Sequence, residues 1–214
     1  MGLREQKKEE QRRDIFRTAF RLFHEKGYDQ TRVQDIIEPL KISEATFFNY
    51  FPNKEALLDE VTVQQLELSA MVVRTELGDK KQSVRDRVKE YARGWAQAWG
   101  ADREFMVVVL TRSNMLRASG SLKEKQLGVY RLLGDLFRQG QARGEIRADR
   151  DPVQLGEILT AICAFTCGNW LIGWWPDSSE ELEPRLMRAI DVFLDGCASP
   201  KKQRAAVKVS RPRK

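Results

Sequence analysis

Residues 31–54 read TRVQDIIEPLKISEATFFNYFPNK, a stretch that contains two short helical patterns with a turn between them. The first pattern repeats apolar residues on one helical face, at Val33, Ile36, Ile37 and Leu40. Thr31 and Gln34 fit the capping-box pattern T-x-x-Q, which predicts a helix that begins at Val33 or just before it. Pro39 and Lys41 would end this helix.

The second pattern runs from Glu44 to Tyr50 and follows Ser43, whose hydroxyl can cap a helix. Phe47 and Phe51 are four residues apart and are expected to face inward, which leaves Glu44, Ala45, Phe48 and Asn49 outward. Asn53 would cap the next helix. A short exposed helix that is braced by a partner at a tight turn is typical of the helix-turn-helix motif. The alternative is a small three-helix core without a binding role.

The same region resembles the N-terminal DNA-binding region of the TetR family of bacterial regulators. The resemblance runs from about Arg13 to Glu55 and rests on spaced positions: Gly27, Tyr28, Thr31, Asp35, Ile36, Ile42, Ser43, Thr46, Phe47, Tyr50, Phe51 and Lys54. The sequence departs from the family pattern at four positions. Lys41 stands where members usually carry Gly, and Ile37 stands where they carry Ala. Phe48 replaces the usual Tyr, and Pro39 has no counterpart.

The resemblance implies a set of side chains that contact double-stranded DNA. Base edges would be read by Gln34, Glu44, Ala45 and Asn49, because Asn suits adenine, Glu suits the cytosine amino group and Ala suits the thymine methyl. Phe48 would add an apolar contact. Phosphates would be held by Thr46, Tyr50 and Lys54, with Thr31 as a further candidate.

Three of these residues have a structural alternative. Gln34 would instead complete the capping box with Thr31. Glu44 would instead supply favourable negative charge at the start of a helix. Phe48 would instead pack inward.

The charge of the chain is uneven. The 214 residues carry a formal net charge of +6, and seven of the Lys and Arg residues lie in residues 201–214, where no acidic residue occurs. The basic character therefore comes from this tail and does not itself argue for DNA binding. The tail is expected to be disordered, either adding non-specific attraction to phosphates or having no role.

Nothing in the composition indicates export or membrane insertion. The longest apolar runs are too short to span a bilayer, and the N-terminus lacks the apolar segment of a signal peptide. Three Cys residues without metal-like spacing suggest no disulfide framework. The sequence therefore favours a cytoplasmic protein.

Beyond Lys54 the chain continues in helical patterns without strand-like alternation, which predicts an all-α fold of about nine helices. Helix starts are indicated by Ser83, Asp102, Asp151 before Pro152, and Glu183 before Pro184. A strongly apolar helix is expected from Val153 to about Trp175. We therefore expect a helix-turn-helix DNA-binding domain at 1–54, a helical ligand-binding and dimerisation domain at 55–199, and the basic tail at 200–214.

The TetR resemblance also implies a small-molecule cavity within the C-terminal helices. The cavity would suit an apolar or aromatic effector and would be lined by Trp95, Trp99, Phe105, Met106, Val109, Met115, Phe137, Cys163 and Phe165. Ordinary core packing is the alternative for each of them. The family pairs through its last two helices, so a homodimer through the last two long helices is expected, with close approach at Gly156, Ala161, Ala164, Gly168 and Gly173.

The sequence thus predicts a ligand-responsive transcriptional repressor that binds a palindromic operator as a homodimer. The alternative is a dimeric helical protein-interaction module with only non-specific DNA binding. An enzyme is not expected, because the chain has one His and shows no nucleophile–base set, phosphate loop or metal-ligand spacing. No metal and no cofactor are expected.

Overall fold

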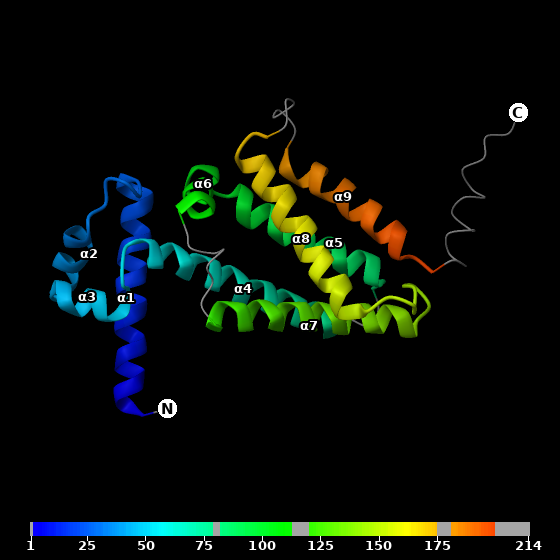
Figure 1. Cartoon of the computed structure of the whole chain (residues 1–214), viewed down its shortest axis with the longest axis horizontal. Helices are drawn as coiled ribbons and strands as arrows, with labels where there is room; N and C mark the ends of the chain where they lie inside the picture. The colour runs from blue at the N-terminus through cyan, green and yellow to red at the C-terminus, as the bar shows by residue number, and fades with distance from the viewer. Residues whose placement is uncertain (1, 79–81, 113–119, 175–180, 200–214) are drawn as a thin grey trace, which may run out of the picture. The chain divides into compact units, whose positions relative to one another are not determined.

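The computed structural model describes residues 2–78, 82–112, 120–174 and 181–199, and within these ranges the chain forms nine helices and no strand. Figure 1 shows them as α1 (Leu3–Lys26), α2 (Val33–Leu40), α3 (Glu44–Tyr50), α4 (Glu55–Gly78), α5 (Val84–Gly100), α6 (Arg103–Arg112), α7 (Gly120–Ala142), α8 (Pro152–Leu171) and α9 (Leu182–Cys197). The all-α prediction is confirmed. Met115, Trp175, Pro176 and the basic tail lie outside the described residues.

The helices belong to two compact units. Unit 1 takes in α1, α2, α3, α4 as far as Gln65, and α6, and unit 2 takes in α4 from Leu66 together with α5, α7, α8 and α9. In unit 1, α2 packs on both α1 and α3. Phe105 of α6 lies against Phe20 and Phe23 of α1, with ring centroids 5.2 and 6.4 Å apart. The helix-turn-helix element is therefore part of a larger apolar core.

Unit 2 is held together chiefly by the packing of α7 on α8, with α9 on α5 and α8. Two glycines allow α7 and α8 to approach closely. A Cβ at Gly156 would lie 2.8 Å from Leu133 Cβ, and one at Gly134 would lie 2.9 Å from Val153 Cγ2. Gly156 therefore serves contact within the chain, and the expectation that it serves close approach between two copies is wrong.

Most of the predicted helix starts are confirmed by hydrogen bonds from backbone amides to the expected side chains. The acceptors are Ser43 (3.1 Å), Asn53 (2.9 Å), Ser83 (3.1 Å), Asp102 (2.9 Å) and Asp151 (2.7 Å). These bonds satisfy amides that the first turn of a helix leaves without a partner. Pro152 follows Asp151 at the first helical position, as expected.

α2 begins at Val33, as predicted, but its cap and two other helix boundaries differ from the predictions. The capping box of α2 is not formed by Thr31 and Gln34, because Asp35 Oδ2 instead accepts the Arg32 amide at 2.8 Å. α8 ends at Leu171 rather than near Trp175, and Gly173 then adopts φ +65°. α9 begins at Leu182 after Glu181, so Pro184 lies inside its first turn.

Candidate nucleic-acid interface

The short helix α3 presents a continuous outer face. Phe47 and Phe51 are 0% and 1% exposed, and their ring centroids lie 6.1 Å apart in the core of unit 1. These two anchors fix the rotation of α3, so the opposite side of the helix faces outward. Phe48 is 43% exposed, and the inward alternative for it is therefore wrong. The exposed set is Glu44, Ala45, Phe48 and Asn49, with Thr46 and Tyr50 half-buried at its edge.

Tyr50 links α3 to the first helix. Its hydroxyl donates a hydrogen bond of 2.9 Å to Gln11 Oε1. Beside this bond lies a groove of about 450 Å³ lined by Glu5, Lys8, Glu9, Arg12, Asn49 and Tyr50. Arg12 is held there by an ion pair with Glu60 of 2.5 Å and lies 4.9 Å from the Phe51 ring centroid. The early part of α1 therefore borders the face that carries the candidate base-reading residues.

The turn between α2 and α3 is intact in spite of its unusual residues. Pro39 lies within the last turn of α2, which ends one residue later at Leu40. Lys41 then takes φ 54° and ψ 40°, the left-handed conformation that Gly adopts without a steric cost. Its amide bonds to Glu38 O at 3.1 Å, which closes the helix. Lys41, in place of the usual Gly, therefore preserves the geometry of the turn but strains the backbone at this residue.

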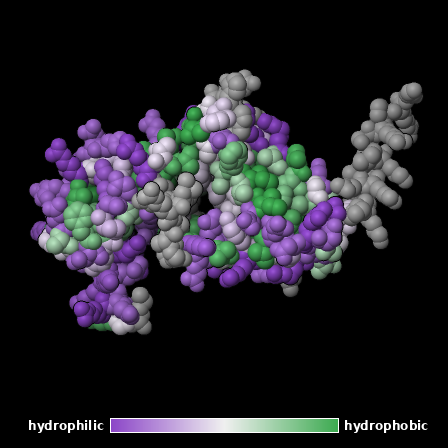
Figure 2. All heavy atoms as spheres, viewed as in Figure 1, coloured by the Kyte–Doolittle hydropathy of each residue, from purple (hydrophilic) through white to green (hydrophobic). Residues whose placement is uncertain are grey.

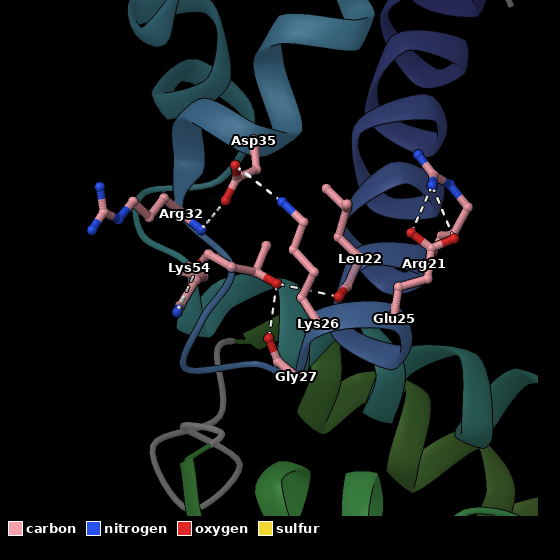
Figure 3. A network of polar contacts seen from close by, with 9 residues as sticks. Arg21, Leu22, Glu25, Lys26, Gly27, Arg32, Asp35 and Lys54 are labelled. Carbon is pink, nitrogen blue, oxygen red and sulfur yellow. Dashed lines mark hydrogen bonds and ion pairs between the residues drawn. The ribbon is translucent and has the colours of Figure 1, made fainter.

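Thr31 lies inside unit 1 and not on its surface. The residue is 1% exposed, and its hydroxyl donates to Gly27 O at 2.8 Å and to Leu22 O at 3.3 Å. It thereby satisfies carbonyls at the C-terminal end of α1 (Figure 3). The expected phosphate contact does not hold for Thr31, because its hydroxyl is already engaged and covered.

Lys54 also makes internal contacts. Its Nζ donates to Tyr28 O at 2.7 Å and Thr31 O at 3.0 Å, and it lies 4.1 Å from the Tyr28 ring centroid. Burial lowers the pKa of Lys54, an effect that Asp29 and Glu55 oppose. The side chain thus joins the start of α4 to the loop after α1. A phosphate bound by Lys54 would have to share it with two backbone carbonyls.

Gln34 is exposed on α2 and takes no part in the helix cap. Asp35 forms that cap, and it also pairs with Lys26 at 3.2 Å (Figure 3). Hydrogen bonding to the Arg32 amide, followed by the contact with Lys26, lowers the pKa of Asp35. Gln34 therefore remains available for a contact outside the chain.

The candidate effector residues fall into both units. Phe105, Met106 and Val109 are buried on α6 in unit 1, whereas Trp95, Trp99, Phe137 and Cys163 belong to unit 2. Trp95 and Trp99 stack with centroids 5.6 Å apart, and Phe137 packs edge-on against Phe193 at 6.0 Å. Phe165 is 71% exposed, so the expectation of an interior lining role does not hold for it.

Two contributions were missed in the sequence. Gln11 lies in a run of charged residues, where nothing distinguishes a side chain that will meet Tyr50 across 39 positions. Tyr91 was not among the candidate site residues, because burial of its hydroxyl carries no signal in the sequence. Among the described residues no helix is long and apolar enough to cross a membrane, and no three potential metal ligands gather.

The matching family model is the one described as bacterial regulatory proteins, tetR family, and it covers residues 15–61. The transcriptional regulator YuxN from Bacillus subtilis is 54% identical over 44 residues, which is 21% of this chain and 15% of that protein. The repressor ComR from Escherichia coli is 26% identical over 150 residues, which is 67% of this chain and 71% of ComR. The match to YuxN thus spans about a seventh of that protein.

Solved structures extend the likeness to the whole fold. The TetR-family repressor FadR from Thermus thermophilus, in complex with lauroyl-CoA, superposes with a TM-score of 0.70 at 21% identity. The superposition covers 86% of this chain and 94% of FadR.

Proposed function

Because the chain belongs to the TetR family of bacterial regulatory proteins, we propose that it is a homodimeric repressor that binds a palindromic operator and releases it when a small apolar effector binds. The observation that carries the proposal is the outer face of α3. Glu44, Ala45, Phe48 and Asn49 are exposed together on one short helix whose rotation is fixed by two buried phenylalanines. Base edges in the major groove are read by such side chains on a recognition helix.

In this proposal the contacts divide into two kinds. Glu44, Ala45 and Asn49, with Gln34 from α2, read base edges, and Phe48 makes apolar contact. Thr46 and Tyr50 hold phosphates, and Lys54, directly before α4, contributes positive charge. Thr46 is a candidate for this, because the residue is only half-buried at the edge of the exposed face. Its hydroxyl lies 2.8 Å from that of Ser43, and either of the two can be the donor.

The proposed dimer uses the outer face of α8. Ile158, Phe165 and Ile172 are exposed at heptad spacing on this helix and the residue after it. The exposed Ala161 lies between the first two, which gives the stripe an a/d pattern typical of paired helices. Val192 of α9, the next helix along the chain, is 75% exposed. Figure 2 shows hydrophobic side chains gathered over the part of unit 2 where Figure 1 draws α8. Exposed apolar patches of this kind mark interaction sites.

The proposed effector binds unit 2. Support comes from the aromatic series Tyr91, Trp95 and Trp99 along one face of α5, and from the similarity of the fold to a repressor that binds lauroyl-CoA. An effector weakens DNA binding only if it binds the DNA-incompetent state more tightly, and couplings of about 1–3 kcal/mol are typical. Lauroyl-CoA supplies an apolar acyl chain, and free coenzyme A is the control for its charged part. Addition of lauroyl-CoA should therefore lower operator affinity by about 5- to 150-fold, and free coenzyme A should not.

The experiment that tests the proposal is selection of binding sites from random duplex DNA, followed by affinity measurements over a range of salt concentrations. A palindrome should be enriched, and Asn49→Ala should relax the preference at one base position in each half-site. Gln97→Ala, which shortens an exposed amide on α5, is the matched control and should change nothing. Binding that ignores sequence and disappears on removal of residues 201–214 would instead support the protein-interaction module.

A further inference from the structure

Tyr91 and Trp95 of α5 each have a polar atom that is buried without a hydrogen-bond partner among the described residues. These atoms are the hydroxyl oxygen of Tyr91 and the indole nitrogen Nε1 of Trp95. Tyr91 is 1% exposed, and the two rings lie one helical turn apart with centroids separated by 6.4 Å. Arg87, one further turn back on α5, is bound instead to Gln139 Oε1 at 3.0 Å.

The pKa of Tyr91 identifies several polar groups around this pair. Burial raises the pKa of Tyr91, and the buried thiol of Cys163 on α8 raises it further. Trp95, Thr160 of α8 and Ser69 of α4 lower it, although none of them reaches the geometry of a hydrogen bond. Thr160 has already donated its proton to Gly156 O at 2.9 Å. The cluster Ser69, Tyr91, Trp95 and Thr160 therefore joins three helices of unit 2 around two unsatisfied groups.

Two buried polar groups without hydrogen-bond partners destabilise the folded protein unless a further group binds them. A buried donor without a partner costs free energy comparable to a lost hydrogen bond, and most buried polar side chains in proteins are paired. The indole N–H can only donate, and the raised pKa of Tyr91 keeps its hydroxyl protonated and able to donate. The missing partner must therefore supply an acceptor. Since Tyr91 is buried, and burial penalises an ionised group, an uncharged acceptor is favoured over a carboxylate.

We infer that Tyr91 and Trp95 form the polar end of the effector site in unit 2, and that they bind a neutral carbonyl oxygen on an otherwise apolar or aromatic ligand. This inference rests on the proposed effector-controlled function and names the chemistry of its ligand. Trp99, which stacks on Trp95, continues the site as an apolar surface. Ketones, esters, amides and thioesters share the required acceptor.

The test compares two probes of the same shape, acetophenone and isopropenylbenzene, which differ only by a carbonyl oxygen in place of a CH₂ group. Titration calorimetry on the full-length protein gives both dissociation constants. The wild-type protein should prefer acetophenone by about tenfold, and Tyr91→Phe should reduce this preference to about twofold or less. Tyr130→Phe is the matched control, because the Tyr130 hydroxyl already accepts a hydrogen bond from Gln126 Nε2 at 2.7 Å. It should retain the full preference.

Thermal unfolding of the ligand-free variants supplies a second readout. Loss of an unsatisfied hydroxyl should leave Tyr91→Phe as stable as the wild-type protein or more stable, whereas Tyr130→Phe should lose stability. A loss of stability in Tyr91→Phe, absence of binding of both probes, or a preference that survives the substitution would each overturn the inference. None of these measurements involves DNA. The inference about Tyr91 and Trp95 can therefore be overturned while operator binding is found, and it can be supported while operator binding is absent.

Discussion

The hydroxyl of Tyr50, at the end of α3, donates a hydrogen bond of 2.9 Å to Gln11 Oε1 in α1. A side chain that is expected to hold a phosphate is thereby positioned by a helix that precedes the helix-turn-helix motif. Because the hydroxyl has one proton, contact with a phosphate requires that proton to turn to the phosphate, and the Gln11 amide to turn over so that its Nε2–H donates to the hydroxyl oxygen. Gln11 is then a positioning residue, because its effect on DNA would pass through Tyr50.

We therefore expect Gln11→Ala to weaken DNA binding about 3- to 10-fold, as expected for loss of one hydrogen bond of about 1 kcal/mol. The loss should be the same for operator and random DNA, because a phosphate contact carries no sequence information. Tyr50→Phe should have a similar effect, and the double variant should be little worse than either. Gln6→Ala, an exposed glutamine of the same helix, is the control. A change in base preference in Gln11→Ala would contradict this role.

Lys41→Gly should stabilise the protein. Lys41 holds φ 54° at the end of α2, and a side chain in the left-handed region costs about 1–2 kcal/mol relative to glycine. Since glycine also gives the unfolded chain more freedom, the net gain should be about 0.5–1 kcal/mol. Urea unfolding measures it. Lys41→Ala removes the same side chain without relieving the backbone and should show no gain, so an equal gain in both variants would point to charge instead of strain.

Lys54→Met should destabilise unit 1 as well as weaken DNA binding. The substitution leaves the carbonyls of Tyr28 and Thr31 without their shared donor, and an unsatisfied buried acceptor costs about 1–3 kcal/mol. Lys26→Met is the control, because the Lys26–Asp35 ion pair lies near the surface and such pairs contribute less than about 1 kcal/mol. Unchanged unfolding of Lys54→Met would mean that the contacts to the two carbonyls add nothing to stability.

Phe165→Asp should convert the proposed dimer to a monomer. The change places a charge in the centre of the exposed α8 stripe, where it would be buried between two copies. Met71→Asp changes a residue of similar exposure (65%) on α4 and should leave the dimer intact. Sedimentation equilibrium distinguishes the two states. Dissociation by Met71→Asp but not by Phe165→Asp would move the interface to α4.

Alkaline pH should destabilise the protein through its buried tyrosines. Burial raises the pKa of Tyr91 above its ordinary value of 10.0, so the folded protein keeps a proton that the unfolded chain loses. The resulting stability is fully present below pH 10.0 and is lost as the pH rises through the higher folded value, by about 1.4 kcal/mol per pH unit. Lys54, whose pKa is lowered, acts in the opposite direction.

A comparison of wild type with Tyr91→Phe isolates the Tyr91 contribution. Urea unfolding at a series of pH values from neutral to alkaline should show a smaller loss in the variant above pH 10.0. Identical pH profiles would show that the Tyr91 hydroxyl ionises as freely in the folded protein as in the unfolded chain.

The sequence by itself determined the helical class, most helix starts and the outer face of α3. These are local properties: a capping side chain such as Ser43 lies within three residues of the amide that it satisfies, and the spacing of Phe47 and Phe51 fixes which side of a short helix is buried. The family resemblance added the DNA-binding role.

The tertiary structure decided which of the candidate residues are free to act. Thr31 and Lys54 match the family pattern, yet both donate to backbone carbonyls of the loop after α1 or of α1 itself. Gln11 meets Tyr50, and Tyr91 lies near Thr160, only after distant segments have packed together. Whether a polar group is satisfied depends on neighbours that are far away in the chain, and helical periodicity contains no information about them.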